Sequence, residues 1–199
     1  MMYFIKATST NGKQMAKRLE ISTITDHDGF IACLMVRVAV FVGEIGIPLD
    51  AAADPNDHCA THVLATVDGK PAGSMRLRFF NDVAVLERLA VLKDYRLRRY
   101  GSRGVAWELG EYAINFCRLK GYTKFYGSSR DGLVDFWTKI APEGVEFYPI
   151  ENVSQEYAGH ASLPMQGRAA PIKNAVRGLD DINLLAVQEA RLPHDLLAA

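Results

Sequence analysis

The sequence predicts a mixed α/β fold, in which helices pack against one sheet, and three observations lead to this prediction. Apolar residues alternate in some segments, as in half-buried strands, and recur every three or four positions in others, as in amphipathic helices. The dipeptide Asp68-Gly69 between two strand-like segments is typical of a β-hairpin turn. The elements also lack the regular βαβ alternation and the Gly-x-Gly-x-x-Gly turn of a dinucleotide-binding fold.

The first half of the chain predicts one helix and three antiparallel strands. Residues 18–25 alternate as a strand does, and Asp26 or Asp28 can cap a helix over the apolar run of residues 30–42. Glycines and prolines in residues 43–57 then break the periodicity, so we expect a loop with room for one short helical turn. The three predicted strands are residues 61–67, 71–80 and 83–92.

The second half predicts helices that alternate with strands. An apolar stripe marks a helix over residues 105–119, which Gly121 ends. Residues 133–140 predict a second helix, which Pro142 stops. The remaining expected elements are strands at residues 122–126, 145–150 and 161–165, a turn at residues 127–130, and an amphipathic helix at residues 172–191.

Composition and charge favour a single cytoplasmic domain over residues 1–199. The 199 residues are 49% hydrophobic and 23% charged, enough for a sizeable buried core. The 23 basic and 23 acidic residues balance, so no overall field favours nucleic acid or an anionic membrane as partner. Cys33, Cys59 and Cys117 are widely spaced, which fits a reducing compartment. Residues 1–20 lack the apolar run of a signal peptide or a membrane span.

The segment with the most chemical information runs from Glu87 to Gly104, from a buried strand through a basic turn into a helix. A helix N-terminus presents unpaired N–H groups and a partial positive charge to a phosphate. Small residues let a phosphate approach the backbone, and arginines can clamp its oxygens. The turn supplies both kinds of residue, namely Arg96, Arg98, Arg99, Gly101, Ser102, Arg103 and Gly104. The alternative is a solvated basic turn that only caps the helix.

This segment resembles motif A of the Gcn5-related N-acetyltransferases (GNAT), in which a strand similar to residues 87–91 leads into Arg/Gln-x-x-Gly-x-Gly/Ala and a helix. The hairpin and the element order are also similar, so the resemblance covers a core of about residues 21–166. It implies a central, mostly antiparallel sheet flanked by helices, with residues 172–191 as an extra C-terminal helix. Arg96 and Gly101 match the motif, whereas Arg99 occupies its middle glycine position.

The resemblance implies acetyl-CoA as the acyl donor and a primary amine of a small molecule or protein as the acceptor, without a metal. The backbone of Leu89 and Val91 would pair with the pantetheine arm of the donor. The implied donor-binding residues are Leu89, Ala90, Val91, Arg96, Arg98, Arg99, Tyr100, Gly101, Ser102 and Arg103. The implied acceptor-binding residues are Arg37, Phe41, Asp54 and Arg76.

For catalysis, the resemblance implies that Glu87 is the general base that removes a proton from the acceptor amine, often through water. A carboxylate on an otherwise apolar strand should have a raised pKa where it is desolvated, which suits a base. The alternative is a structural ion pair between Glu87 and Arg76 or Arg78 on the neighbouring strand.

The protonation of the leaving thiolate has no obvious donor. The family commonly places a tyrosine on the helix after the fifth strand for this step, but Trp137 stands at the matching position and its indole is no useful acid. Either Tyr126 or Tyr100 takes this role, or the thiolate leaves unprotonated.

Other functions stay open on the sequence alone. An acyl-homoserine lactone synthase-like acyltransferase, with acyl carrier protein as donor, has the same fold and a similar residue pattern. Arg99 and Trp137 are compatible with a non-catalytic member of the family that binds acyl-CoA.

Two further alternatives rest on short motifs. The basic run of residues 96–100 is the sole basis for a nucleic-acid-binding module, and His58-Cys59-x-x-His62 is a metal motif without a second ligand pair. The C-terminal helix would cover a sheet edge, form a homodimer contact or border the pocket.

Overall fold

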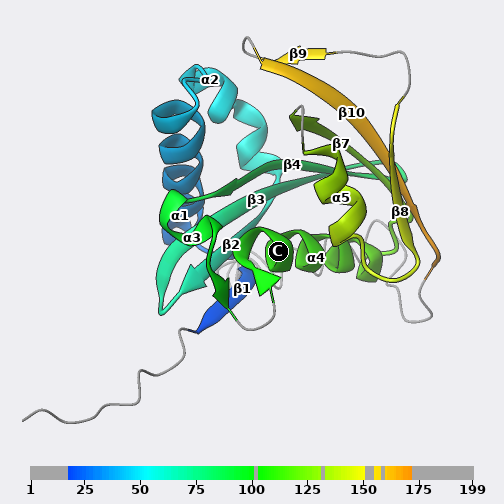
Figure 1. The fold of residues 1–199 in the computed structure, drawn as a ribbon, viewed down its shortest axis with the longest axis horizontal. Coiled ribbons are helices and arrows are strands. Elements are labelled where there is room, and N and C mark those ends of the chain that lie inside the picture. Colours follow the sequence, from blue (N-terminus) through cyan, green and yellow to red (C-terminus); the bar gives the residue numbers. More distant parts are fainter. Residues whose placement is uncertain (1–17, 101–102, 131–132, 151–154, 158–159, 172–199) are drawn as a thin grey trace, which may run out of the picture.

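The computed structural model describes residues 18–100, 103–130, 133–150, 155–157 and 160–171. Its main sheet has eight strands in the order β1-β2-β3-β4-β7-β10-β8, with β9 paired to β10. Neighbouring strands are antiparallel except for β4 and β7, which are parallel. The mixed α/β fold with a mostly antiparallel sheet and flanking helices is therefore confirmed (Figure 1).

The elements have the following bounds. The strands of the main sheet are β1 (Leu19–Thr23), β2 (Thr61–Val67), β3 (Lys70–Phe80), β4 (Val83–Val91), β7 (Lys124–Arg130), β8 (Val145–Pro149), β9 (Gln155–Tyr157) and β10 (His160–Ala169). A separate two-stranded sheet joins β5 (Arg99–Tyr100) and β6 (Arg103–Gly104). The helices are α1 (His27–Arg37), the π-helix η1 (Val38–Glu44), α2 (Leu49–Ala52), the 3-10 helix η2 (Pro55–Cys59), α3 (Lys93–Arg96), α4 (Val105–Leu119) and α5 (Val134–Ile140).

Some expectations fall outside the described residues. The N-terminal residues 1–17, the turn residues Gly101 and Ser102, and the expected helix over residues 172–191 belong to this group. Among the described helices, none is long and apolar enough to cross a membrane.

Both faces of strand β4 are covered by buried side chains. Val91 belongs to the large core cluster, together with Val105 and Leu109 of α4, whereas Ala90 packs with Val36 and Val40 in a second cluster. Successive side chains of a strand point to opposite faces, so α4 covers one face and the α1–η1 segment covers the other. In Figure 1, α1 and α2 accordingly lie on one side of the molecule and α4 with α5 on another.

The first helix begins before residue 30, where the apolar run starts, and its last part is a π-helix rather than an α-helix. Asp26 is its N-cap, and the Asp26 carboxylate accepts a hydrogen bond of 2.7 Å from the N–H of Gly29, so α1 starts at His27 rather than Phe30. After Arg37 the chain continues as a π-helix to Glu44. π-helical segments are rare in proteins, and those that do occur are often at functional sites.

The predicted hairpin is confirmed. Asp68 and Gly69 have φ angles of 51° and 74°, the left-handed values that a type I′ turn requires. The turn joins β2 and β3, and β4 follows β3 after a second turn with Asn81 at a φ of 47°.

One prediction about the second half is wrong. Gly127–Arg130, expected as a turn, continues β7 to Arg130. These residues pair with β10, with Gly127 opposite Met165 and Arg130 opposite Ser162. Gly127 and the polar residues after it are tolerated in a strand because β10 pairs with their backbone N–H and C=O groups. This pairing with a distant segment cannot be predicted from the local sequence.

Candidate active site

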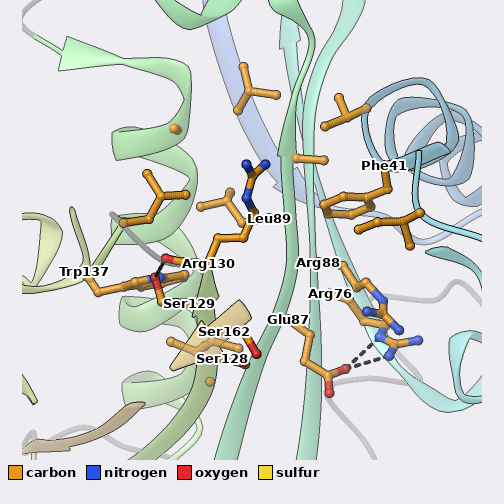
Figure 2. A pocket seen from close by; sticks show the side chains of 18 of the residues that line it. Phe41, Arg76, Glu87, Arg88, Leu89, Ser128, Ser129, Arg130, Trp137 and Ser162 are labelled. Carbon is orange, nitrogen blue, oxygen red and sulfur yellow. Dashed lines mark hydrogen bonds and ion pairs between the residues drawn. The ribbon is translucent and has the colours of Figure 1, made fainter. Parts of the chain in front are cut away.

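A cavity of about 870 Å³ opens where β4 and β7 separate. Residues 83–86 of β4 pair with residues 124–127 of β7. From there β4 continues to Val91, and no strand in the described part of the chain pairs with it on that side. The cavity is lined by residues of η1, α2, β3, β4, α3, α4, β7, α5 and β10. Figure 2 shows Phe41, Arg76, Glu87 and Arg88 on one side of β4, which we call the cluster side. Side chains from β7 and α5, with Ser162, occupy the other side, which we call the α5 side.

A β-bulge in β4 lies at the centre of the cavity. Arg76 is opposite Glu87 and Ser74 is opposite Ala90, so β4 has one residue more than β3 between these pairs. Arg88, within the bulge, has a φ of 56°, a left-handed conformation that costs a non-glycine residue about 1–2 kcal/mol. Its guanidinium donates a hydrogen bond of 3.0 Å to Asp54. Bulges re-aim side chains next to active sites, and this one directs Glu87 and Arg88 toward the same cluster.

Beyond the bulge, the backbone of β4 alternates between its two neighbours. The N–H of Leu92 donates to the carbonyl of Ala72, at 2.9 Å, on the β3 side. Because backbone groups of successive residues point to opposite sides of a strand, those of Val91 point into the opening. Counted back through Ala90, which is opposite Ser74, the same alternation directs those of Leu89 there. The carbonyl of Val91 accepts a hydrogen bond of 2.7 Å from Nε of Arg96. The backbone groups of Leu89 and the N–H of Val91 are thus oriented for an added extended ligand.

Seven charged residues on the cluster side form one connected network, the arginine–carboxylate cluster. They come from α1, the Asp54–Asp57 turn, β3 and β4, and they are Arg37, Asp54, Asp57, Arg76, Arg78, Glu87 and Arg88. Arg76 is its centre, and its side chain is 1% exposed. Its guanidinium donates to Asp54, Asp57 and Glu87 at 2.9–3.1 Å.

The buried end of the cluster is the pair Arg37–Asp57. Both Nη atoms of Arg37 donate to the Asp57 carboxylate, at 2.7 and 2.6 Å, and the Arg37 side chain is 0% exposed. Desolvation alone would raise the pKa of Asp57, but hydrogen bonds from Arg37, the backbone of Asp54 and Arg76 outweigh it and lower the pKa to about 2. Asp57 is therefore ionised at neutral pH and fixes the position of Arg76.

His62 adds no positive charge to this end. Burial and the neighbouring Arg37 and Arg76 lower the pKa of His62, so the ring is neutral at neutral pH. Its Nε2–H donates to the backbone carbonyl of Asp57 at 2.9 Å. Among the described residues, no group of three His, Cys, Asp or Glu side chains is placed to hold a metal ion.

Glu87 lies at the open end of the cluster and forms both ion pairs considered from the sequence. Its carboxylate accepts hydrogen bonds of 2.9 Å from Nε of Arg76, 2.9 Å from Nε of Arg78 and 2.5 Å from Nη2 of Arg78. The side chain is still 19% exposed and lines the cavity. A structural ion pair and contact with a ligand are therefore compatible for this residue.

The α5 side has fewer charged residues than the cluster side. Among the described residues that line it, the cation is Arg130. Trp137 is 9% exposed and stacks edgewise against Phe136. The side chain of Arg130 extends from the end of β7 into the cavity, past Leu89 (Figure 2). Among the described residues, none accepts a hydrogen bond from the Arg130 guanidinium or forms an ion pair with it. Tyr126 also lines this side.

The predicted donor-binding turn is only partly at the cavity. Arg96 lines it and forms an ion pair of 2.7 Å with Glu44 of η1. Arg98 and Arg99 are exposed, and Arg103 is paired with Glu111 of α4. The Tyr100 side chain is buried in the core cluster and does not line the cavity.

The cavity brings together eight of the residues assigned from the sequence. These are Phe41, Asp54, Arg76, Glu87, Leu89, Ala90, Val91 and Arg96. Arg37 does not line it and acts only through Asp57. Arg78, Arg88 and Arg130 also line the cavity but were not expected there from the sequence. The spacing of Arg76 and Arg78, two residues apart on one strand face, is a signal that could have identified Arg78.

Residues 34–141 of the chain match the family model described as Acetyltransferase (GNAT) family. The chain belongs to the GNAT family. A curated Bacillus subtilis (strain 168) protein named as an acetyltransferase is 32% identical in an alignment of 117 residues that covers 55% of this chain and 78% of that protein. The chain is thus an acyltransferase of the GNAT type.

Solved GNAT-type structures have the same fold at low identity. A Lactobacillus plantarum protein described as an N-acetyltransferase is 19% identical, with a TM-score of 0.65, over 76% of this chain and 99% of that one. A Pseudomonas aeruginosa protein described as an acyl-CoA N-acyltransferase is 21% identical, with a TM-score of 0.63, over 76% of this chain and 100% of that one.

Proposed function

We propose that this GNAT acyltransferase transfers an acetyl group from acetyl-CoA to a primary amine of a small molecule or protein. The observation that carries the proposal is the edge of β4 at Leu89 and Val91, which no strand of the described residues pairs with. Leu89 belongs to the bulge that turns Glu87 into the same cavity, and Val91 follows it. The Pseudomonas aeruginosa neighbour, whose description names acyl-CoA, supports this choice of donor.

The residues at the opening fit the extended arm of such a donor. The N–H and carbonyl of Leu89 and the N–H of Val91 would hold its amides as an added strand. Arg96, at the cavity wall, would hold phosphate oxygens together with the turn before α4. When bound, the donor supplies a thioester whose carbonyl carbon the amine attacks.

Glu87 would remove the proton from the attacking amine, directly or through a water molecule. Arg76 and Arg78 hold its carboxylate in place, so the base needs no reorientation during the reaction. The cationic guanidinium of Arg130 would stabilise the negative charge on the departing sulfur. Trp137 would pack beside it without giving a proton.

Calorimetric titration with acetyl-CoA and with CoA tests the donor, and turnover with a panel of amines tests the base. We expect Glu87→Gln to bind acetyl-CoA as the wild type does but to lose on the order of 10²–10⁴-fold in kcat. Glu146→Gln, at an exposed position of β8, is the matched control and should behave as wild type. If neither acetyl-CoA nor CoA bound, the donor assignment would be wrong, and an acyl carrier protein donor or a non-catalytic role would replace it.

A further inference from the structure

The cavity wall carries more positive than negative charge. Arg96 and Arg130 are assigned above to the donor, and the remaining charged residues that line the cavity are the cationic Arg76, Arg78 and Arg88 and the anionic Asp54 and Glu87. The connected cluster itself contains four arginines and three carboxylates, and the neutral His62 does not change this balance. A ligand with an anionic group therefore complements this wall better than one with several amines.

The carboxylates of the wall are already engaged. Oδ1 of Asp54 accepts from Nη1 of Arg76 and from the N–H of Asn56, and Oδ2 accepts from Arg76 and Arg88. Oε2 of Glu87 accepts from both Arg76 and Arg78. An ammonium group would have to displace arginines to reach these three oxygens. Among the described residues, only Nη2 of Arg78 donates to Oε1 of Glu87, so one amine can still reach that oxygen. The wall is thus poorly built for a polyamine or a chain of lysines.

The guanidinium of Arg78, by contrast, has one edge in use and one available. Its Nε and Nη2 atoms face Glu87, at 2.9 and 2.5 Å, as a bidentate pair. The opposite edge consists of Nη1 and the second N–H of Nη2. Among the described residues, none accepts a hydrogen bond from this Nη1. The side chain is 22% exposed, and the residue lines the cavity. Two parallel N–H groups match the two oxygens of a carboxylate.

The positions of Arg78 and Glu87 fix how far apart the groups of such a ligand lie. Oε1 of Glu87 and Nη2 of Arg78 are 2.5 Å apart, so the base is adjacent to the available guanidinium edge. An acceptor whose amine faces Glu87 and whose carboxylate faces Arg78 must carry the two groups close together. An α-amino acid does so, and α-amino groups lose their proton more easily than the side chain of lysine.

The part of the cavity wall that η1 and the segment after it provide is apolar. Its lining from η1 and the following segment consists of Val40, Phe41, Ile45, Ile47 and Ala51. Figure 2 shows the ring of Phe41 on the same side of β4 as Glu87 and Arg88. We infer that the acceptor is a free α-amino acid with an apolar side chain, whose carboxylate is bound by Arg78. This inference names the acceptor class within the proposed function and rests on it.

The test is direct binding of matched ligands, measured by calorimetry in the presence and absence of CoA. Phenylalanine, phenylalaninamide and phenethylamine differ only in the group beside the amine. We expect phenylalanine to bind at least about tenfold more tightly than the other two, since a hydrogen-bonded charge pair has that strength. Arg78→Gln should abolish the preference, Arg78→Lys should restore part of it, and Arg168→Gln, at an exposed position of β10, should leave it intact.

The outcomes separate this inference from the proposed function. Equal binding of the three ligands, tighter binding of phenethylamine, or no binding of any would overturn the acceptor class. A preference for phenylalanine that survives in Arg78→Gln would overturn the role of Arg78. Acetyl transfer to amines that lack a carboxylate would support the proposed function and contradict the inference. Binding of phenylalanine without any binding of CoA would support the inference and contradict the donor.

Discussion

The two sides of β4 use their charges in different ways. On the cluster side, four arginines and three carboxylates bind one another, and the central arginine is almost completely buried. On the α5 side, Arg130 reaches into the cavity with no acidic partner among the described residues. A network in which every charged residue has a partner of opposite charge holds a geometry, whereas a cation without such a partner stabilises negative charge that a ligand or a reaction brings. We therefore assign positioning mainly to the cluster and charge stabilisation to Arg130.

Removal of Arg37 is the strongest challenge to the view that the cluster positions the site. Arg37→Met leaves the buried Asp57 without its bidentate partner, so we expect the free energy of unfolding to fall by about 3–5 kcal/mol. Chemical denaturation measures this, with Arg98→Met at an exposed position as control. A loss below about 1 kcal/mol would mean that the pair is not a structural anchor.

The sequence predicts the scaffold better than the site, and particular residues explain why. Alternation and the Asp68-Gly69 turn define β2 and β3 locally, and the motif around Glu87 locates β4. The cluster, however, joins α1, the turn at Asp54 and two strands, and no local pattern relates Arg37 to Asp57 twenty residues later. Gly127–Arg130 continues β7 only because β10 pairs with it, and that extension is what brings Arg130 to the cavity.

Acid should weaken the cluster side in a defined pH range. The pKa of Asp57 is lowered to about 2 in the folded protein, so its ionised form stabilises the fold above the ordinary aspartate pKa of about 4. Stability is then lost as the pH falls from about 4 through 2, by up to about 2 kcal/mol from this residue. Asp57→Asn should be less stable at pH 7 and should lose less stability on acidification. Parallel acid dependence of the two proteins would contradict this assignment.

On the α5 side, Arg130→Gln removes the unmatched cation. We expect kcat to fall about tenfold while the binding of acetyl-CoA changes less, because the charge on sulfur develops during the reaction. Introducing Trp137→Tyr into this variant should recover part of the loss, since a phenol can give the proton that indole cannot. Steady-state kinetics and calorimetry measure both. An effect on binding alone would make Arg130 a donor-binding residue instead.

The central claim is that the donor pairs with the free edge of β4, and amide hydrogen exchange tests it most directly. The N–H of Leu92 is already bonded to Ala72, whereas those of Leu89 and Val91 point into the opening. We expect acetyl-CoA to slow exchange at Leu89 and Val91 and to leave Leu92 nearly unchanged. Unchanged exchange at Leu89 and Val91 in the presence of saturating acetyl-CoA would contradict the claim.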